Sequence, residues 1–208
     1  MPAPELLLVR HGRSAHRESS WVDVHGLRRS IAAYDAAEIA SEPAPPEALV
    51  HLVRDARRVI ASDLPRAVAS AARLAPGGPI ERSALLREAP LETPDLPLPA
   101  LGGLRLPFWA WGTVFGMRWL WASLRKAPPP GVDAAALARA EEAADWLATQ
   151  ANDAGGRVVI ITHAMFRLLV SEALARRGWR GPARRPYHEW SAWQWWPPAT
   201  ERSAGIGG

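Results

Sequence analysis

The sequence lacks cysteine altogether, and Lys126 is the single lysine among its 208 residues. Without cysteine the chain forms no disulfides, no thiolate zinc sites and no cysteine nucleophile. One lysine outside any glycine-rich frame also excludes the lysine-containing phosphate loop of nucleotide-binding proteins. The fingerprints of serine hydrolases, dinucleotide-binding folds, zinc proteases and calcium loops are missing as well. These absences exclude several common enzyme classes.

Long hydrophobic runs are also absent. No stretch of about 18 uncharged apolar residues occurs, so we predict no membrane-spanning helix. The first residues hold only four consecutive apolar residues, Leu6 to Val9, with no basic segment before them, so we predict no signal peptide and expect a cytoplasmic protein.

Charge of one sign is present only in modest excess, although the sequence pI is about 10.5. Arginine accounts for 24 of the 25 basic residues, and the formal net charge is +4. Because arginine stays charged at all ordinary pH values, a small excess of it holds the pI high. No dense Lys/Arg run occurs, so we expect no nucleic-acid partner.

Short apolar runs alternate with helical patterns along the chain. This alternation predicts an α/β fold: a three-layer α/β/α sandwich with a mostly parallel sheet. Asp133 is the expected N-cap of a long helix that ends at Gly155. The last strand is expected at a sheet edge because two prolines follow it. The predicted strands are 6–9, 59–61, 80–86, 158–161 and 191–196, and the predicted helices are 30–39, 62–74 (capped by Ser62 or Asp63), 133–154 and 165–177.

Polar motifs follow four of these strands, directly or one loop later. They are Arg10-His11-Gly12, Ser62 to Arg66, Arg87-Glu88 and Thr162-His163-Ala164. The carboxyl ends of parallel strands share one crevice, so we expect these side chains to converge. Guanidinium groups match phosphate oxygens, neutral imidazole is a nucleophile, and a carboxylic acid can protonate a leaving oxygen.

The segment LLLVRHGRS resembles the signature of the histidine phosphatase superfamily, and IASDLPRAVASAA resembles the second motif of that family. Glu88 and His163 follow in the family's order. The resemblance covers residues 5–88 and 133–175. It implies a phosphoglycerate-mutase-like fold and a metal-independent phosphatase that uses a phosphohistidine intermediate, a small phosphorylated substrate and no cofactor.

The resemblance also implies a role for each matching residue. His11 corresponds to the nucleophile, and Glu88 to the group that protonates the leaving oxygen and then activates water. For the first of these roles the pKa of Glu88 must be raised. The remaining matches are expected around the phosphoryl group: Arg10, Arg66 and His163 as its ligands, Gly12 as a close backbone turn, and Ser14 where the family often has serine.

Some positions depart from the family pattern. Arg17 stands where the family often has asparagine, and we keep it as a substrate-pocket candidate. Ala164 follows His163, so the branch that takes its proton donor from that position is excluded and Glu88 remains. Glu88 is followed by Ala89-Pro90 instead of the frequent glycine, and Glu92 and Asp95 are its substitutes.

Eleven tryptophans are an unusual number, and four of them lie between residues 89 and 131, a segment that also holds many of the prolines. We interpret the segment of about 90–130 as a Pro/Trp-rich insertion that covers the active-site end of a single domain, 1–208. Its side chains could form a lid, with Trp109 and Trp111 as pocket candidates. The alternatives are packing on the domain or on a second subunit, against Trp190 to Trp196, and, ranked last, contact with a membrane surface through Trp109 to Trp121.

Three functions stay open at this point. The leading one is hydrolysis of phosphomonoesters. The second is phosphoryl transfer of the phosphoglycerate-mutase type, and the third is a non-catalytic or membrane-associated phosphate-binding module. A homo-oligomer is also left open.

Overall fold

The computed structural model describes residues 3–16, 20–90, 105–107, 110–111, 113 and 132–199. Most of the predicted insertion therefore lies outside the described residues. The elements are β1 (Glu5–Arg10), β2 (Trp21–Val22), α1 (Val24–Ala36), α2 (Glu47–Arg54), β3 (Arg58–Ser62), α3 (Pro65–Leu74), β4 (Glu81–Ser83), the 3₁₀ helix η1 (Ala84–Leu86), β5 (Leu106–Pro107), α6 (Ala134–Ala154), β6 (Arg157–Thr162), α7 (Ala164–Arg176) and β7 (Ala192–Trp195).

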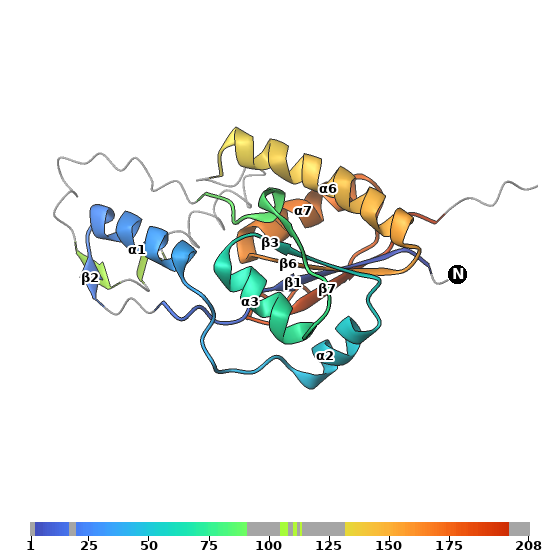
Figure 1. The fold of residues 1–208 in the computed structure, drawn as a ribbon. Coiled ribbons are helices and arrows are strands. Elements are labelled where there is room, and N and C mark those ends of the chain that lie inside the picture. The colour runs from blue at the N-terminus through green and yellow to red at the C-terminus, as the bar shows by residue number, and fades with distance from the viewer. Residues whose placement is uncertain are drawn as a thin grey trace, which may run out of the picture.

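A five-stranded sheet forms the middle layer, in the order β4-β3-β6-β1-β7. The first four strands run parallel, and β7 pairs antiparallel with β1 at the edge. Helices α6 and α7 cover one face, and α2 and α3 cover the other (Figure 1). The predicted three-layer α/β/α sandwich, its mostly parallel sheet and its C-terminal edge strand are confirmed.

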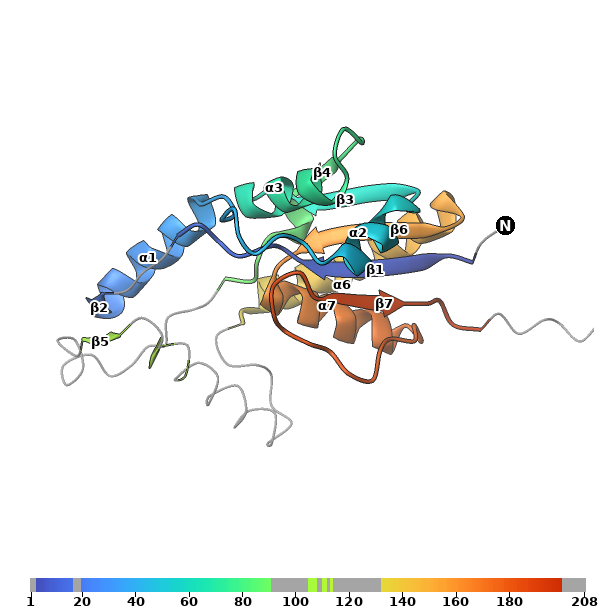
Figure 2. The ribbon, with the colours of Figure 1, turned by 90° about the horizontal axis from the view of Figure 1, so that it is seen from below.

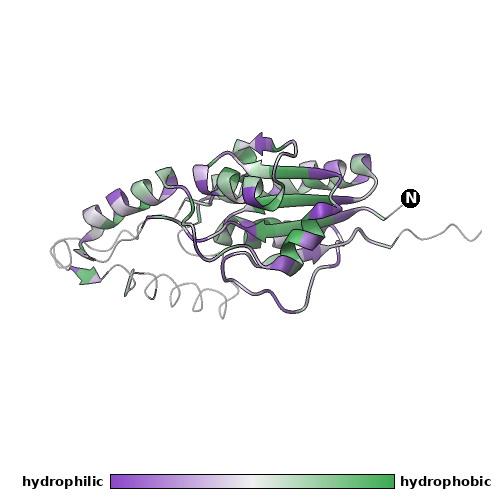
Figure 3. Cartoon of the chain, turned by 60° about the horizontal axis from the view of Figure 1, so that its bottom comes forward, coloured by the Kyte–Doolittle hydropathy of each residue, from purple (hydrophilic) through white to green (hydrophobic). Residues whose placement is uncertain are grey.

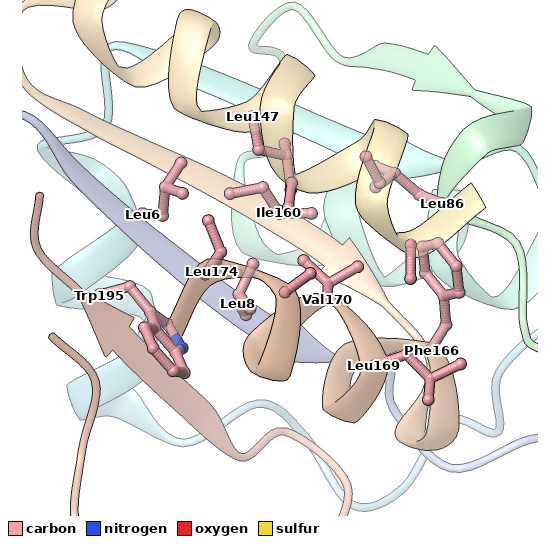
Figure 4. Close-up of a cluster of buried hydrophobic side chains, with 14 of the residues drawn as sticks. Leu6, Leu8, Leu86, Leu147, Ile160, Phe166, Leu169, Val170, Leu174 and Trp195 are labelled. Atoms are coloured by element: carbon pink, nitrogen blue, oxygen red, sulfur yellow. The ribbon is translucent and has the colours of Figure 1, made fainter. Parts of the chain in front are cut away.

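The two core layers follow from the period of the strands, whose side chains alternate between faces. Leu6, Leu8 and Ile160 lie with the residues of α6 and α7, as Figure 4 shows for this cluster. Leu7 and Val159, one position away, lie in the other cluster with α2 and α3. Both faces of the central strands are thus apolar, and Figure 3 colours most of the length of these strands as hydrophobic. Burial of each such side chain stabilises the fold by about 1.5–3 kcal/mol.

The end signals of α6 are those that the sequence predicts. The Asp133 side chain accepts a hydrogen bond from the Ala136 N–H at 2.6 Å, and Gly155 closes the helix in the left-handed region at φ 59°. The predicted caps of α3 are wrong. Leu64 is its N-cap and makes no side-chain cap bond, while Pro65 occupies the first turn. Ser62 ends β3 instead, and Asp63 pairs with Arg87 at 2.6 Å.

Three further element boundaries differ from the prediction. The helix expected at 30–39 is α1, which starts earlier because Asp23 caps it through the Gly26 N–H. The strand expected at 80–86 divides into β4 and η1, because the Ser83 side chain accepts from the Leu85 N–H and starts a helical turn. Helix α2 was not predicted; it is a short amphipathic helix that buries Leu49 and Val53.

Helix α1 extends away from the carboxyl end of the sheet, with the β2–β5 pair beside its start (Figure 2). There Val22, Leu27 and Trp111 form a small separate cluster. Among the described residues, no helix combines the length and apolar character that crossing a bilayer requires.

Candidate active site

Strand register brings two histidines together at the carboxyl end of the sheet. Arg10 pairs with Thr162 across β1 and β6, so His11 and His163 each stand one residue beyond a matched pair. The His11 N–H also donates to the Thr162 carbonyl at 3.0 Å. The ring centroids of the two histidines lie 5.0 Å apart. Both rings are almost completely buried.

The contacts of His11 determine its tautomer. Arg66 Nε donates to His11 Nε2 at 3.2 Å, and a guanidinium N–H cannot accept, so Nε2 carries a lone pair. Nδ1 therefore carries the proton and donates to the Gly12 carbonyl at 2.6 Å. Burial lowers the pKa of His11 to about 3, although the bond to Gly12 opposes this, and nearby arginines add to the shift. His11 is neutral at pH 7.

Arg66 comes from the first turn of α3 and is completely buried. Besides His11, its guanidinium binds the end of α1: the carbonyls of Tyr34 and Asp35 at 3.1 and 3.3 Å, and the Asp35 carboxylate at 2.9 Å. It also lies over the Tyr34 ring, 4.5 Å from the centroid. The end of α1 thus fixes this cation beside His11.

His163 is the N-cap of α7 and has one nitrogen in use. Its Nε2 lies 2.9 Å from the Ser62 hydroxyl at the end of β3. Its Nδ1 is buried and has no hydrogen-bond partner among the described residues. Burial, with the positive charges of neighbouring groups, lowers the pKa of His163 well below its usual range, so this ring is also neutral. A buried unpartnered ring nitrogen is available to a ligand.

Glu88 reaches the same helix end from the loop after η1. Its Oε1 accepts from the Phe166 N–H in the first turn of α7 at 2.9 Å, and from the Ala89 N–H at 3.0 Å. These bonds and the charge of Arg66 lower the pKa of Glu88, but desolvation is larger and raises it overall. The direction is the one that a general acid requires.

Arg10 and Arg167 connect the site to the loop before β7. Arg10 donates to the Tyr187 carbonyl, and its Nε is buried without a partner among the described residues. Arg167, on α7, is completely buried and binds the Pro186 carbonyl at 3.1 Å and the Ser191 carbonyl at 2.6 Å. Desolvation, together with the charge of Arg10, lowers the pKa of Arg167 to about 9.

The φ of Gly12 is not in the left-handed region, so its backbone conformation does not require a glycine. The requirement comes from packing. A Cβ on Gly12 would lie 2.3 Å from Cζ2 of Trp190. Trp190, at φ 61°, is buried, and its Nε1 donates to the Pro43 carbonyl at 3.0 Å. The Gly12 N–H donates to Ser70 Oγ at 2.9 Å, and Ser70 donates in turn to the Arg66 carbonyl at 2.7 Å.

The other predicted site residues fall into two groups. Ser14 is buried in the loop after His11 and accepts from the His16 N–H at 3.2 Å. Trp111 is not brought to the histidines; it packs in the cluster at the start of α1 and donates to the Val22 carbonyl at 3.1 Å. The remaining candidates lie outside the described residues: Arg17, Trp109, Glu92, Asp95, Trp119 and Trp121.

Sequence reasoning missed several residues that surround the histidines. They are Tyr34, Asp35, Ser70, Arg139 and Arg167. Tyr34 and Asp35 belong to a helix that projects from the sheet, and Arg139 and Arg167 lie within helices with no motif around them. Only Ser70 had a signal, since it lies one turn after Arg66 in the second motif and so faces the same side of α3.

No protein-family model matches the sequence, and no curated protein matches it either. Several solved structures are similar to the structure of this chain. A phosphoserine phosphatase from Entamoeba histolytica, in complex with 3-phosphoglyceric acid, has a TM-score of 0.53 at 13% identity, covering 83% of this chain and 80% of that one. YhfR from Bacillus stearothermophilus has a TM-score of 0.53 at 18% identity, with 91% and 89% covered.

The ecdysone phosphate phosphatase from Bombix mori, in complex with tungstate, has a TM-score of 0.51 at 14% identity, covering 97% of this chain and 96% of that one. Each of these likenesses covers at least 80% of both proteins compared. The chain has the fold of these proteins, which is the predicted phosphoglycerate-mutase-like fold.

Proposed function

We propose that the protein is a metal-independent phosphatase that hydrolyses phosphomonoesters through a phosphohistidine at His11. The observation that carries this proposal is the environment of His11: a neutral imidazole whose Nδ1–H is bound by the Gly12 carbonyl and whose Nε2 lone pair faces the Arg66 guanidinium. A lone pair held ready at neutral pH among positive charges suits attack on a dianionic phosphoryl group.

In the first step, His11 Nε2 forms a bond to phosphorus while the ester P–O bond breaks. Arg66, Arg10 and His163 are the donors for the phosphoryl oxygens, and His163 donates from Nδ1 in the tautomer whose Nε2 accepts from the Ser62 hydroxyl. Nε of Arg10 and Nδ1 of His163 are buried without partners among the described residues. Glu88 gives its proton to the leaving oxygen. In the second step, Glu88 takes a proton from water, which attacks phosphorus, and the P–N bond breaks to release phosphate.

The test uses 4-nitrophenyl phosphate and the variant His11→Ala. We expect kcat/KM to fall by at least about a thousandfold, because the nucleophile is lost. His51→Ala is the matched control, since His51 is exposed on α2 and, among the described residues, pairs only with Glu47. Rapid alkaline quenching of the wild type with labelled substrate should trap a phosphoenzyme that is stable in alkali and loses its label in acid, and His11→Ala should not form it. Activity retained in His11→Ala, or turnover that requires an added metal ion, would overturn the proposal.

A transferase of the phosphoglycerate-mutase type would give a different result when phosphoglycerate is supplied as the substrate: isomerised phosphoglycerate would accumulate without release of free phosphate. A non-catalytic module would bind inorganic phosphate but would turn over neither phosphoglycerate nor 4-nitrophenyl phosphate.

A further inference from the structure

The loop that carries Glu88 has little secondary structure to hold it. Glu88 lies two residues after η1, a single 3₁₀ turn, and the chain beyond Pro90 is outside the described residues. A 3₁₀ turn leaves its last carbonyls without partners inside the helix. Contacts that hold the main chain of this loop therefore also hold the carboxyl group of Glu88, which protonates the leaving oxygen in the proposed function.

Arg139 supplies those partners from the first half of α6. Its Nη1 donates to the Leu85 carbonyl at 2.9 Å and the Arg87 carbonyl at 2.7 Å, and its Nη2 donates to the Glu88 carbonyl at 3.0 Å. The planar guanidinium thus binds three carbonyls of one loop. Lysine, a point charge with rotating donors, does not reproduce this geometry.

The same guanidinium also contacts the other element that holds Glu88. It lies over the Phe166 ring, 4.1 Å from the centroid, and the Phe166 N–H is the donor to Glu88 Oε1. Arg139 therefore connects the Glu88 loop to the start of α7, where His163 is the N-cap. Thr162 adds one further tie, since its hydroxyl donates to the Leu86 carbonyl at 2.8 Å.

We propose that Arg139 is a positioning residue that sets the place of the Glu88 carboxyl group relative to the leaving oxygen. This inference rests on the proposed function of Glu88 as proton donor. Arg139 donates to main-chain carbonyls and to no side-chain carboxylate among the described residues. Its charge also acts on Glu88 and His163 through space, and Arg139→Lys, which keeps the charge, separates that effect from the effect on position.

The test compares two esters that differ in their need for a proton donor. Phenyl phosphate has a poor leaving group and depends on general acid catalysis, whereas 4-nitrophenolate leaves with little help. For Arg139→Met we expect kcat/KM, which reports the step in which the leaving oxygen departs, to fall about tenfold to a hundredfold with phenyl phosphate and less than about threefold with 4-nitrophenyl phosphate. The difference arises because a displaced acid loses part of its contribution to that step. Arg139→Lys, which keeps the charge, should give an intermediate selective loss.

Arg177→Met is the matched control. Arg177 also joins α6 to α7, through Glu141 and Asp145, but it makes no contact with the Glu88 loop among the described residues. Its loss should lower the melting temperature and leave the ratio of the two kcat/KM values unchanged. In the background Glu88→Gln, Arg139→Met should add no further selective loss.

Several outcomes would overturn the inference about Arg139 and leave the proposed function intact: equal losses for both esters, the same selective loss in Arg177→Met, or a full additional loss in the Glu88→Gln background. If wild type and His11→Ala hydrolyse the esters equally, or if neither does, the proposed function fails and the inference fails with it. If Arg139→Met does not fold, Arg139→Lys and its double variant with Glu88→Gln decide the question.

Discussion

The contact between Gly12 and Trp190 gives a quantitative prediction. In Gly12→Ala, the new methyl carbon would stand 2.3 Å from Cζ2, 2.8 Å from Cε2 and 3.0 Å from Cη2 of the indole. Three ring atoms at such distances cannot all be accommodated, so the indole or the main chain has to move. Trp190 is 4% exposed and has little free space around it.

The expected cost has two parts. Inserting one methyl into a packed core costs about 1–3 kcal/mol. Moving the indole also strains or breaks its hydrogen bond to the Pro43 carbonyl, which contributes about 1 kcal/mol. The free energy of unfolding should therefore fall by about 2–4 kcal/mol, and the melting temperature by about 5–15 °C for a chain of this length. Activity should fall as well, because the Gly12 carbonyl holds His11 Nδ1.

Thermal unfolding followed by circular dichroism measures this change. Gly78→Ala is the matched control, because a Cβ there meets its nearest atom, the Ala75 carbonyl oxygen, at an ordinary 3.5 Å. The decisive comparison is made in a Trp190→Ala background, where the clash is gone and Gly12→Ala should cost almost nothing. An undiminished cost in that background, or an unchanged melting temperature in Gly12→Ala alone, refutes the packing argument.

Three further predictions concern the same site. The native pKa of His11 is about 3, against 6.5 for the free side chain, so the stability present at neutral pH is lost as the pH falls from about 6.5 toward 3. The loss amounts to up to about 1.4 kcal/mol per pH unit. Urea unfolding between pH 7 and 5 should show this decrease in the free energy of unfolding, and His11→Asn should make it smaller. Glu88 has a raised native pKa, so its ionisation destabilises the fold as the pH rises. At pH 8 the free energy of unfolding of Glu88→Gln should therefore be at least as large as that of the wild type. Its kcat with phenyl phosphate should fall about a hundredfold or more, because the proton donor is lost. Ser70→Ala leaves the buried Gly12 N–H without its acceptor and should cost about 1–3 kcal/mol in unfolding free energy, part of which Ser70→Thr should recover.

The parts of the fold that follow from local patterns could be predicted from the sequence. The apolar runs around Leu7 and Val159 fix the parallel strands, and Asp133 and Gly155 fix the ends of α6. Register then brings His11 and His163 together, because a parallel pair aligned at one residue stays aligned at the next. The strand positions and their parallel register are therefore enough to predict that the motifs after the strands converge.

Boundaries that depend on a single competing hydrogen bond were not predictable in the same way. Asp63 is a good N-cap residue by type, but its carboxylate pairs with Arg87, 24 positions later, and α3 begins without a side-chain cap. Ser62, the other expected cap, faces His163 from the end of β3. In both cases the side chain that local rules predict as a helix N-cap interacts instead with a residue far away in the sequence.

The tryptophans near the C-terminus also owe their places to tertiary packing. Trp193 and Trp195 are completely buried on β7, and Arg167 lies over the Trp193 ring at 3.7 Å from its centroid. Trp190 closes on Gly12. These side chains therefore pack on the domain itself. Composition alone could not distinguish this from a binding surface, since exposed and buried tryptophans look alike in a sequence.

The excess of arginine over lysine has a structural consequence at the strand ends. Arg66, Arg139 and Arg167 each bind at least two main-chain carbonyls, and so fix the end of α1, the Glu88 loop and the loop before β7. A planar fork with several donors can bind several carbonyls from one position, which the single ammonium group of lysine does less well. The charges of Arg66 and Arg167, with that of Arg10, also lower the pKa of His11 and help to keep its ring neutral. Two oxygens of a phosphoryl dianion would reduce the repulsion among these cations without changing the loops. The groups that build the site are therefore also a source of its affinity for phosphate.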